Sequence, residues 1–105
     1  MDDVKVYMVV NLDIEDKDTY LKYEKGFFPI LKKHGGEFVT FDDSVRHLEG
    51  PEPLPGGRVI IFSFPSEAAA DGWYNDPEYQ ELAKIRRSST VLNNLSIIKS
   101  LPKRN

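Results

Sequence analysis

The hydrophobic residues of this chain change their spacing along the sequence, and the order of these changes leaves few folds open. Residues 4–12 place an apolar side chain at every second position, which predicts a β-strand. Residues 17–34 place apolar side chains three and four positions apart, which predicts a helix with one buried stripe. Asp16 is a suitable N-cap for this helix, and Gly35 is a suitable residue to end it.

The rest of the chain predicts further strands and two short helical segments. In order, we expect a strand at residues 36–41 that can resume at 45–49, a proline- and glycine-rich loop at 50–57, a strand at 58–64 that is buried on both faces, helical segments at 66–73 and 76–87, and a strand at 92–101. Ser66 and Asp76 are suitable N-caps. Pro77 fits the first position of its helix because a missing N–H has no consequence there.

The order of these elements is strand, helix, strand, strand, helix, strand. Two strand–helix–strand halves of this kind form the ferredoxin-like βαββαβ sandwich, an α+β fold in which the helices cover one face of a four-stranded antiparallel sheet. A chain of 105 residues forms one domain, here residues 1–105. The other face of the sheet would carry exposed apolar side chains, so we expect a homodimer that covers this face with a second copy.

The composition of the chain excludes several kinds of binding partner and site. The net charge of −3 argues against nucleic acid, whose phosphates select a basic surface. The chain has no cysteine, which excludes disulfides, thiolate metal sites and a cysteine nucleophile. No apolar run approaches the roughly 20 residues that span a bilayer, and the N-terminus is acidic where a signal peptide is basic. We therefore predict a cytoplasmic protein that binds neither a membrane nor nucleic acid.

The segment WYNDPEYQ, residues 73–80, places Trp73, Tyr74 and Tyr79 around an Asp-Pro helix break. One interpretation is core packing, in which the rings wedge the helix joint against the sheet. The other is a ligand pocket, in which the indole N–H or a phenol oxygen faces the ligand beside the unpaired backbone groups of the helix ends. The sequence leaves both interpretations open.

Arg86 follows Tyr79 by two helical turns and so lies on nearly the same helix face. It can form a structural ion pair, for which Glu49 is one candidate partner. It can also be a solvated charge at the helix end, where a cation suits the helix dipole. A third hypothesis is that Arg86 holds the anionic part of a small acid.

Several stretches of the chain together resemble one family. They are Tyr7 in the first strand, DTYLKYEKGFFPILKKHGGEF, LEG before the proline-rich loop, RVIIFSFPSEAAADGWYNDPEYQ, and Arg86. The chain resembles the domain of unknown function 1330 family of the dimeric α/β-barrel superfamily. The resemblance implies a ferredoxin-like protomer that pairs sheet to sheet into a barrel. The wider superfamily includes cofactor-free monooxygenases, isomerases and haem-handling proteins, which use pockets between the sheet and the helices.

Two functions fit these residues. The first is a cofactor-free enzyme, monooxygenase- or isomerase-like, that acts on a small organic acid, with His47 or Glu49 moving protons. The second is a non-catalytic dimeric module that binds a small molecule or regulates. The candidate ligand-binding residues are Tyr7, Asn11, Trp73, Tyr79 and Arg86. The two histidines lack metal-binding spacing and no cofactor-binding motif occurs, so we expect no metal and no cofactor.

Overall fold

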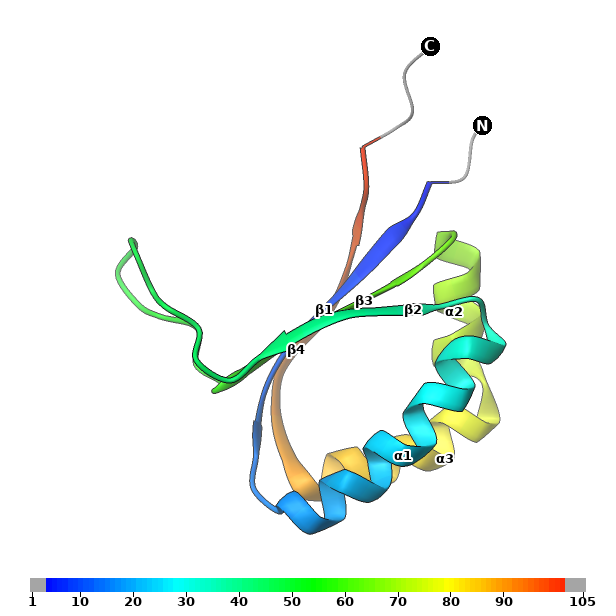
Figure 1. The fold of residues 1–105 in the computed structure, drawn as a ribbon, viewed down its shortest axis with the longest axis horizontal. Coiled ribbons are helices and arrows are strands. Elements are labelled where there is room, and N and C mark those ends of the chain that lie inside the picture. The colour runs from blue at the N-terminus through cyan, green and yellow to red at the C-terminus, as the bar shows by residue number, and fades with distance from the viewer. Residues whose placement is uncertain (1–3, 102–105) are drawn as a thin grey trace.

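The computed structural model describes residues 4–101 and confirms the predicted ferredoxin-like fold. One antiparallel sheet of four strands, in the order β2-β3-β1-β4, has its helices on one face (Figure 1). The elements are β1 (Val6–Ile14), α1 (Lys17–Lys33), β2 (Glu37–Asp42), β3 (Arg58–Phe64), α2 (Glu67–Asn75), α3 (Pro77–Ser89) and β4 (Thr90–Lys99). The helical segments predicted at 66–73 and 76–87 are the helices α2 and α3, which meet at Asp76.

The core lies between the helices and one face of the sheet. On β1 this face carries Val6, Met8, Val10 and Leu12, all of them buried. The antiparallel register places Phe62 of β3 opposite Met8 on the same face. Across from the sheet, α1 buries its predicted stripe, which consists of Tyr20, Tyr23, Phe27 and Leu31, and it also buries Ile30. Each fully buried large apolar side chain stabilises the fold by roughly 1.5–3 kcal/mol.

The helix starts follow from capping side chains. Asp16 accepts a hydrogen bond from the backbone N–H of Thr19, and Ser66 accepts one from Ala69. Asp76 accepts the N–H of Glu78 through its side chain, which starts α3 directly after α2 ends. Each such cap contributes about 1 kcal/mol, and the joint between α2 and α3 therefore lies where the sequence predicts it.

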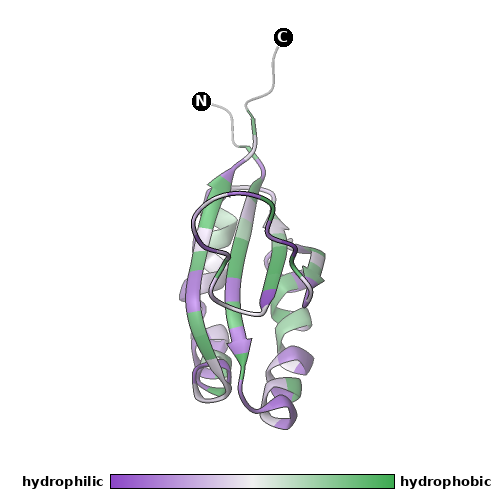
Figure 2. Cartoon of the chain, turned by 90° about the vertical axis from the view of Figure 1, so that its left-hand side faces the viewer, coloured by the Kyte–Doolittle hydropathy of each residue, from purple (hydrophilic) through white to green (hydrophobic). Residues whose placement is uncertain are grey.

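The chain between β2 and β3 differs from the prediction. Residues 45–49 do not resume the second strand, because β2 ends at Asp42, whose side chain accepts the N–H of Ser44 at 2.8 Å and turns the chain out of the sheet. Residues 43–57, which we call the arm, lead away from the sheet on the side opposite the helices (Figure 1). Figure 2 views the molecule from that side, with the arm in front of the sheet.

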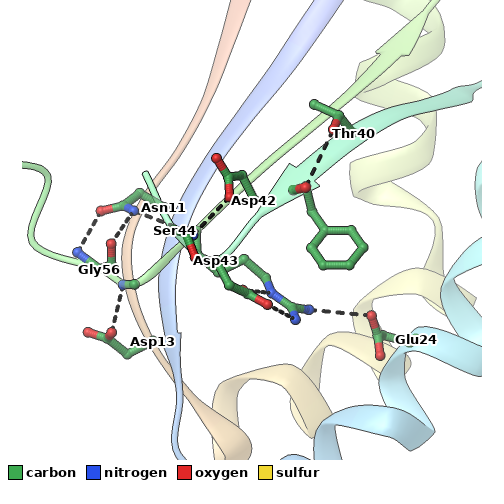
Figure 3. A network of polar contacts seen from close by, with 11 residues as sticks. Asn11, Asp13, Glu24, Thr40, Asp42, Asp43, Ser44 and Gly56 are labelled. Atoms are coloured by element: carbon green, nitrogen blue, oxygen red, sulfur yellow. Dashed lines mark hydrogen bonds and ion pairs between the residues drawn. The ribbon is translucent and has the colours of Figure 1, made fainter. Parts of the chain in front are cut away.

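The end of the arm is fastened to β1 by one side chain. Asn11 donates to the carbonyl oxygens of Gly56 and Arg58 at 3.0 and 3.1 Å, and its Oδ1 accepts the N–H of Gly56 at 2.9 Å (Figure 3). Gly57 donates to Asp13 at 2.8 Å. A Cβ at Gly56 would lie 2.9 Å from the backbone of Leu12, so this close approach requires glycine.

β3 is buried on one face and only partly covered on the other. Ile60, Phe62 and Phe64 face the helices and are buried, whereas Val59 and Ile61 on the opposite face are partly exposed. The prediction of burial on both faces is therefore not met within one protomer. The helix-free face remains the surface that the expected second copy would cover.

Candidate functional site

A small cavity lies between the sheet and the helices. Its volume is about 40 Å³, which is room for about three water molecules. Aromatic side chains from five elements line most of it, namely Tyr20, Tyr23, Phe27, Phe28, Phe38, Phe41, Phe62, Trp73 and Tyr79. The cavity therefore has room for one small chemical group in mainly aromatic surroundings.

The joint between α2 and α3 brings Trp73 and Tyr79 into this wall. Their ring centroids are 4.1 Å apart, and their exposed fractions are 0% and 1%. Trp73 also packs against Phe62 and Phe64 of the sheet, at centroid distances of 5.3 and 5.5 Å. The joint is thus a packed wedge and a cavity wall at once, and the two interpretations of WYNDPEYQ share the same residues.

Arg86 is the charged residue of this wall that lacks a partner. Its exposed fraction is 4%, and its Nε and Nη1 have no hydrogen-bond partner within residues 4–101. The indole Nε1 of Trp73 is unpaired in the same way. The predicted ion pair with Glu49 does not form, because residues 45–49 belong to the exposed arm instead of a strand beside α3.

The backbone around Arg86 is fixed although its side chain is unpaired. Thr90 donates its hydroxyl to the carbonyl oxygen of Arg86 at 2.7 Å, and Ser89 donates to that of Ile85 at the same distance. These bonds satisfy carbonyl groups that the end of a helix leaves open. The guanidinium is consequently held beside the cavity by a rigid helix end.

Two tyrosine hydroxyls complete the polar wall. The oxygens of Tyr23 and Tyr79 are 3.0 Å apart and share one hydrogen bond. Burial, and secondarily the neighbouring Tyr79, raises the pKa of Tyr23 well above its usual value, while the charge of Arg86 opposes this shift. Burial and the charge of Glu24 raise the pKa of Tyr20 to about 12. The phenols of Tyr20 and Tyr23 therefore stay protonated at neutral pH and can donate hydrogen bonds.

Arg58 closes the other end of the cavity. Its guanidinium donates to the carboxylate of Asp43 at 2.6 and 2.9 Å, and it stacks over the ring of Phe41 at 4.3 Å. Its Nη1 lies 3.6 Å from Glu24 of α1 (Figure 3). Arg58 therefore has partners on both sides, in contrast to Arg86.

The structure brings only part of the predicted site together. Trp73, Tyr79 and Arg86 line the cavity, and so do Tyr20 and Tyr23, which were not among the predicted site residues. The signal for these two was present, since both lie on the buried stripe of α1 that faces the sheet. No group of three histidine, aspartate or glutamate side chains in the described part of the chain has the geometry of a metal site.

The other predicted residues lie elsewhere. Tyr7 is on the helix-free face of the sheet, partly exposed, and Asn11 fastens the arm. His47 and Glu49 are exposed on the arm, where the ring Nε2 of His47 lies 2.9 Å from the carbonyl oxygen of Gly50. A single protomer therefore gives neither arm residue a place at the cavity.

The fold defines a class, the ferredoxin-like α+β proteins. Within this class, the chain belongs to the family described as "Domain of unknown function (DUF1330)", whose sequence profile matches residues 5–101. No curated protein matches the sequence significantly.

Solved structures with the same fold come from several bacteria. A protein of unknown function from Rhodopseudomonas palustris is 22% identical with a TM-score of 0.77, over 97% of this chain and 86% of that chain. SnoaB, a cofactor-independent oxygenase from Streptomyces nogalater, is 13% identical with a TM-score of 0.59, over 95% and 96% of the two chains. HapK from Hahella chejuensis is 12% identical with a TM-score of 0.63 and the same coverage. Identities this low establish the fold alone.

Within residues 4–101, no helix is both long enough and apolar enough to cross a bilayer.

Proposed function

We propose that this protein binds a small organic acid in the cavity between sheet and helices, with Arg86 holding the anionic group. The observation that carries the proposal is the buried Arg86 side chain, whose Nε and Nη1 have no hydrogen-bond partner in the described part of the chain. Arginine stays charged in proteins, and an uncompensated buried charge is unfavourable by several kcal/mol. A carboxylate or enolate oxygen would accept hydrogen bonds from Nε and Nη1 and remove this penalty.

The neighbouring groups support an oxyanion as the ligand. The indole N–H of Trp73 is a second buried donor without a partner. The hydrogen bond between Tyr23 and Tyr79 uses one of their two hydroxyl hydrogens and leaves the other to be donated. Donors fixed in a water-poor cavity stabilise negative charge more strongly than the same donors in water.

The reaction that we propose is a cofactor-free one, monooxygenase- or isomerase-like. A base removes a proton from the carbon beside a carbonyl group, and the electron pair moves to the carbonyl oxygen, where Arg86 and Trp73 would stabilise the enolate. Where a carbon–carbon double bond adjoins the deprotonated carbon, the enolate extends over it, and reprotonation at its far carbon shifts the double bond and completes an isomerisation. Attack of the enolate carbon on dioxygen forms a C–O bond and, after protonation, a hydroperoxide, which begins an oxygenation. The likeness of fold to SnoaB is compatible with the second route.

The cavity offers one carboxylate as a candidate base. Glu24 is the carboxylate among the residues lining the cavity, and its Oε2 is already 3.6 Å from Arg58. A catalytic role for His47 or Glu49 stays a prediction, which requires the arm to reach a cavity. Because Glu24 is already paired with Arg58, the structure also favours a second candidate function. This function is a non-catalytic dimeric module that binds the same acid. For either function we assign the cysteine-free chain to the cytoplasm as a homodimer, with Tyr7 and Asn11 as further predicted ligand contacts.

A thermal-shift screen of small carboxylic and keto acids tests the proposal, since a ligand that binds only the folded state raises its stability. Tyr79→Phe and Arg86→Met should each weaken the best acid by about 1–3 kcal/mol, because polar groups are left unmatched. Their effects should be non-additive, because both side chains would contact one ligand. Lys84→Met, on the exposed face of α3, is the control and should leave the affinity unchanged. Additive losses, or unchanged affinity in both single variants, would contradict the site.

The same acid then separates the two candidate functions. An enzyme consumes it in the presence of air, which proton NMR detects as new product signals. A binding module returns the acid unchanged at the end of the incubation. Glu24→Gln should stop the turnover of an enzyme that uses this carboxylate as its base and leave binding in place.

A further inference from the structure

A second hollow lies on the other side of Arg86. It is a groove of about 510 Å³ between α2, the end of α3 and the helix-facing side of β4. Its apolar surface comes from Met8 of β1 and from Leu95 and Ile97 of β4, which the helices cover only in part. The groove follows from the topology, because β4 is an edge strand and its outer side has no neighbouring strand.

Arg86 belongs to both hollows. It lines the inner cavity and the groove, and Leu92 and Leu95 do the same. These three side chains therefore form the wall between the two spaces. A ligand whose anionic group contacts the guanidinium has the groove within reach on the other side of this wall.

The two volumes suit different parts of one molecule. The inner cavity has room for about three waters and is therefore matched to a carboxylate-sized group. The groove lies within the roughly 300–1,000 Å³ range of small-molecule sites. A compact acid such as acetate would leave the apolar floor of the groove in contact with water.

The charges indicate which kind of tail the groove accepts. Asp71 and Arg87 both line the groove, and the guanidinium of Arg87 already donates to the side-chain oxygen of Gln80 at 3.1 Å. Apart from Arg86, these two opposite charges leave no net charge to hold a second acidic group. Met8, Leu95 and Ile97 offer an apolar floor, with no charge along it. A single carboxylate at one end and an uncharged apolar tail complement this arrangement.

We propose that the groove receives the apolar tail of the acid whose carboxylate Arg86 holds, so that the ligand is an elongated monocarboxylic acid. This inference rests on the proposed function, since it requires Arg86 to be the anion site. It adds the length and the polarity of the ligand, which the cavity alone does not determine.

A series of straight-chain acids tests the inference. Butanoate, hexanoate, octanoate and decanoate are titrated into the full chain by calorimetry. Burial of each added methylene should raise the affinity by about two- to fourfold. Ile97→Thr, at a partly buried position of an edge strand, should reduce this gain per methylene while butanoate binds as before. Leu95→Thr should reduce the same gain and also weaken butanoate, because Leu95 lines the inner cavity as well as the groove. Thr suits a strand, and circular dichroism verifies that both variants fold.

The matched control is Val91→Thr. Val91 lies on β4 next to Leu92, and its side chain is on the opposite face of the strand, opposite Asp13 of β1. This variant should keep the full gain per methylene. Phe38→Thr examines the side of the cavity that β2 lines, where the Phe38 ring is partly exposed.

The outcomes separate the two proposals. Affinity that is independent of chain length, or a gain that Phe38→Thr removes and Ile97→Thr does not, overturns the groove while Arg86 remains the anion site. Binding of all four acids that survives Arg86→Met overturns the proposed function. If none of the four acids binds, both the groove proposal and its ligand class are contradicted.

Discussion

Asp76 links the helix joint to the end of α1. Its Oδ2 lies 2.8 Å from Nε2 of His34 and 3.0 Å from Nζ of Lys33. The hydrogen bond with His34, followed by that with Lys33, holds the pKa of the Asp76 carboxyl well below its usual range. The joint that carries Trp73 and Tyr79 is therefore tied to α1 by a group that responds to acid.

This contact predicts how stability depends on pH. The folded-state pKa of Asp76 is lower than its unfolded value of about 3.9, so its contribution is complete above that value and is lost as the pH falls below it. Asp76→Asn keeps a capping oxygen for Glu78 but removes the charge. The difference in melting temperature between wild type and Asp76→Asn should be largest near neutral pH and shrink between about pH 5 and pH 2.

Thermal unfolding by circular dichroism across this range measures the difference. Glu52→Gln, which changes an exposed carboxylate on the arm, is the control and should follow the wild type at every pH. A constant difference between wild type and Asp76→Asn over the whole range would show that the charge of Asp76 does not contribute.

At the scale of elements, local sequence signals predicted where the helices begin. Features that depend on contacts between distant residues were not predicted. Asp16, Ser66 and Asp76 cap helices through hydrogen bonds two to three residues away, so the sequence alone locates them. Residues 45–49 were predicted as a place where the second strand can resume, but a strand needs a neighbour to pair with, and the turn at Asp42 leads the chain away from the sheet. The missing partner of Arg86 has the same origin, since the proposed partner Glu49 lies on that arm.

The arm predicts a tolerance to shortening. Residues 51–54 are exposed, whereas the fastening by Asn11 begins at Gly56. Deleting residues 51–54 should leave the melting temperature nearly unchanged, because shortening a solvent-exposed loop changes the loop-closure entropy little. Asn11→Ala should lower the stability by about 1–3 kcal/mol, because buried backbone groups of Gly56 lose their partner. A fall of about ten degrees on deletion would mean that the arm packs as structure.

At the scale of the whole molecule, the helix-free face of the sheet predicts a homodimer. This face carries Val9, Val59, Ile61 and Ile98, and the arm projects on the same side (Figure 2). Burying this face against a second copy would remove its apolar area from water. Light scattering in the tens of micromolar should therefore report a dimer.

Charge substitutions locate the contact. Ile61→Lys should give a monomer, whereas Leu21→Lys, on the exposed side of α1, should remain dimeric. A wild-type monomer at these concentrations would contradict the prediction. A dimer that persists in Ile61→Lys would place the contact on another surface.

Arg86 is buried with Nε and Nη1 unpaired within residues 4–101, and under the proposed function a ligand supplies their partner. The most direct measurement compares the unfolding free energies of wild type and Arg86→Met, without ligand and with octanoate. Met has a similar length and no charge, so the ligand-free variant should be more stable than wild type by about 1–3 kcal/mol. Octanoate should stabilise the wild type and leave Arg86→Met unchanged. A variant several kcal/mol less stable than wild type, with the octanoate effect retained, would show instead that Arg86 is a structural residue.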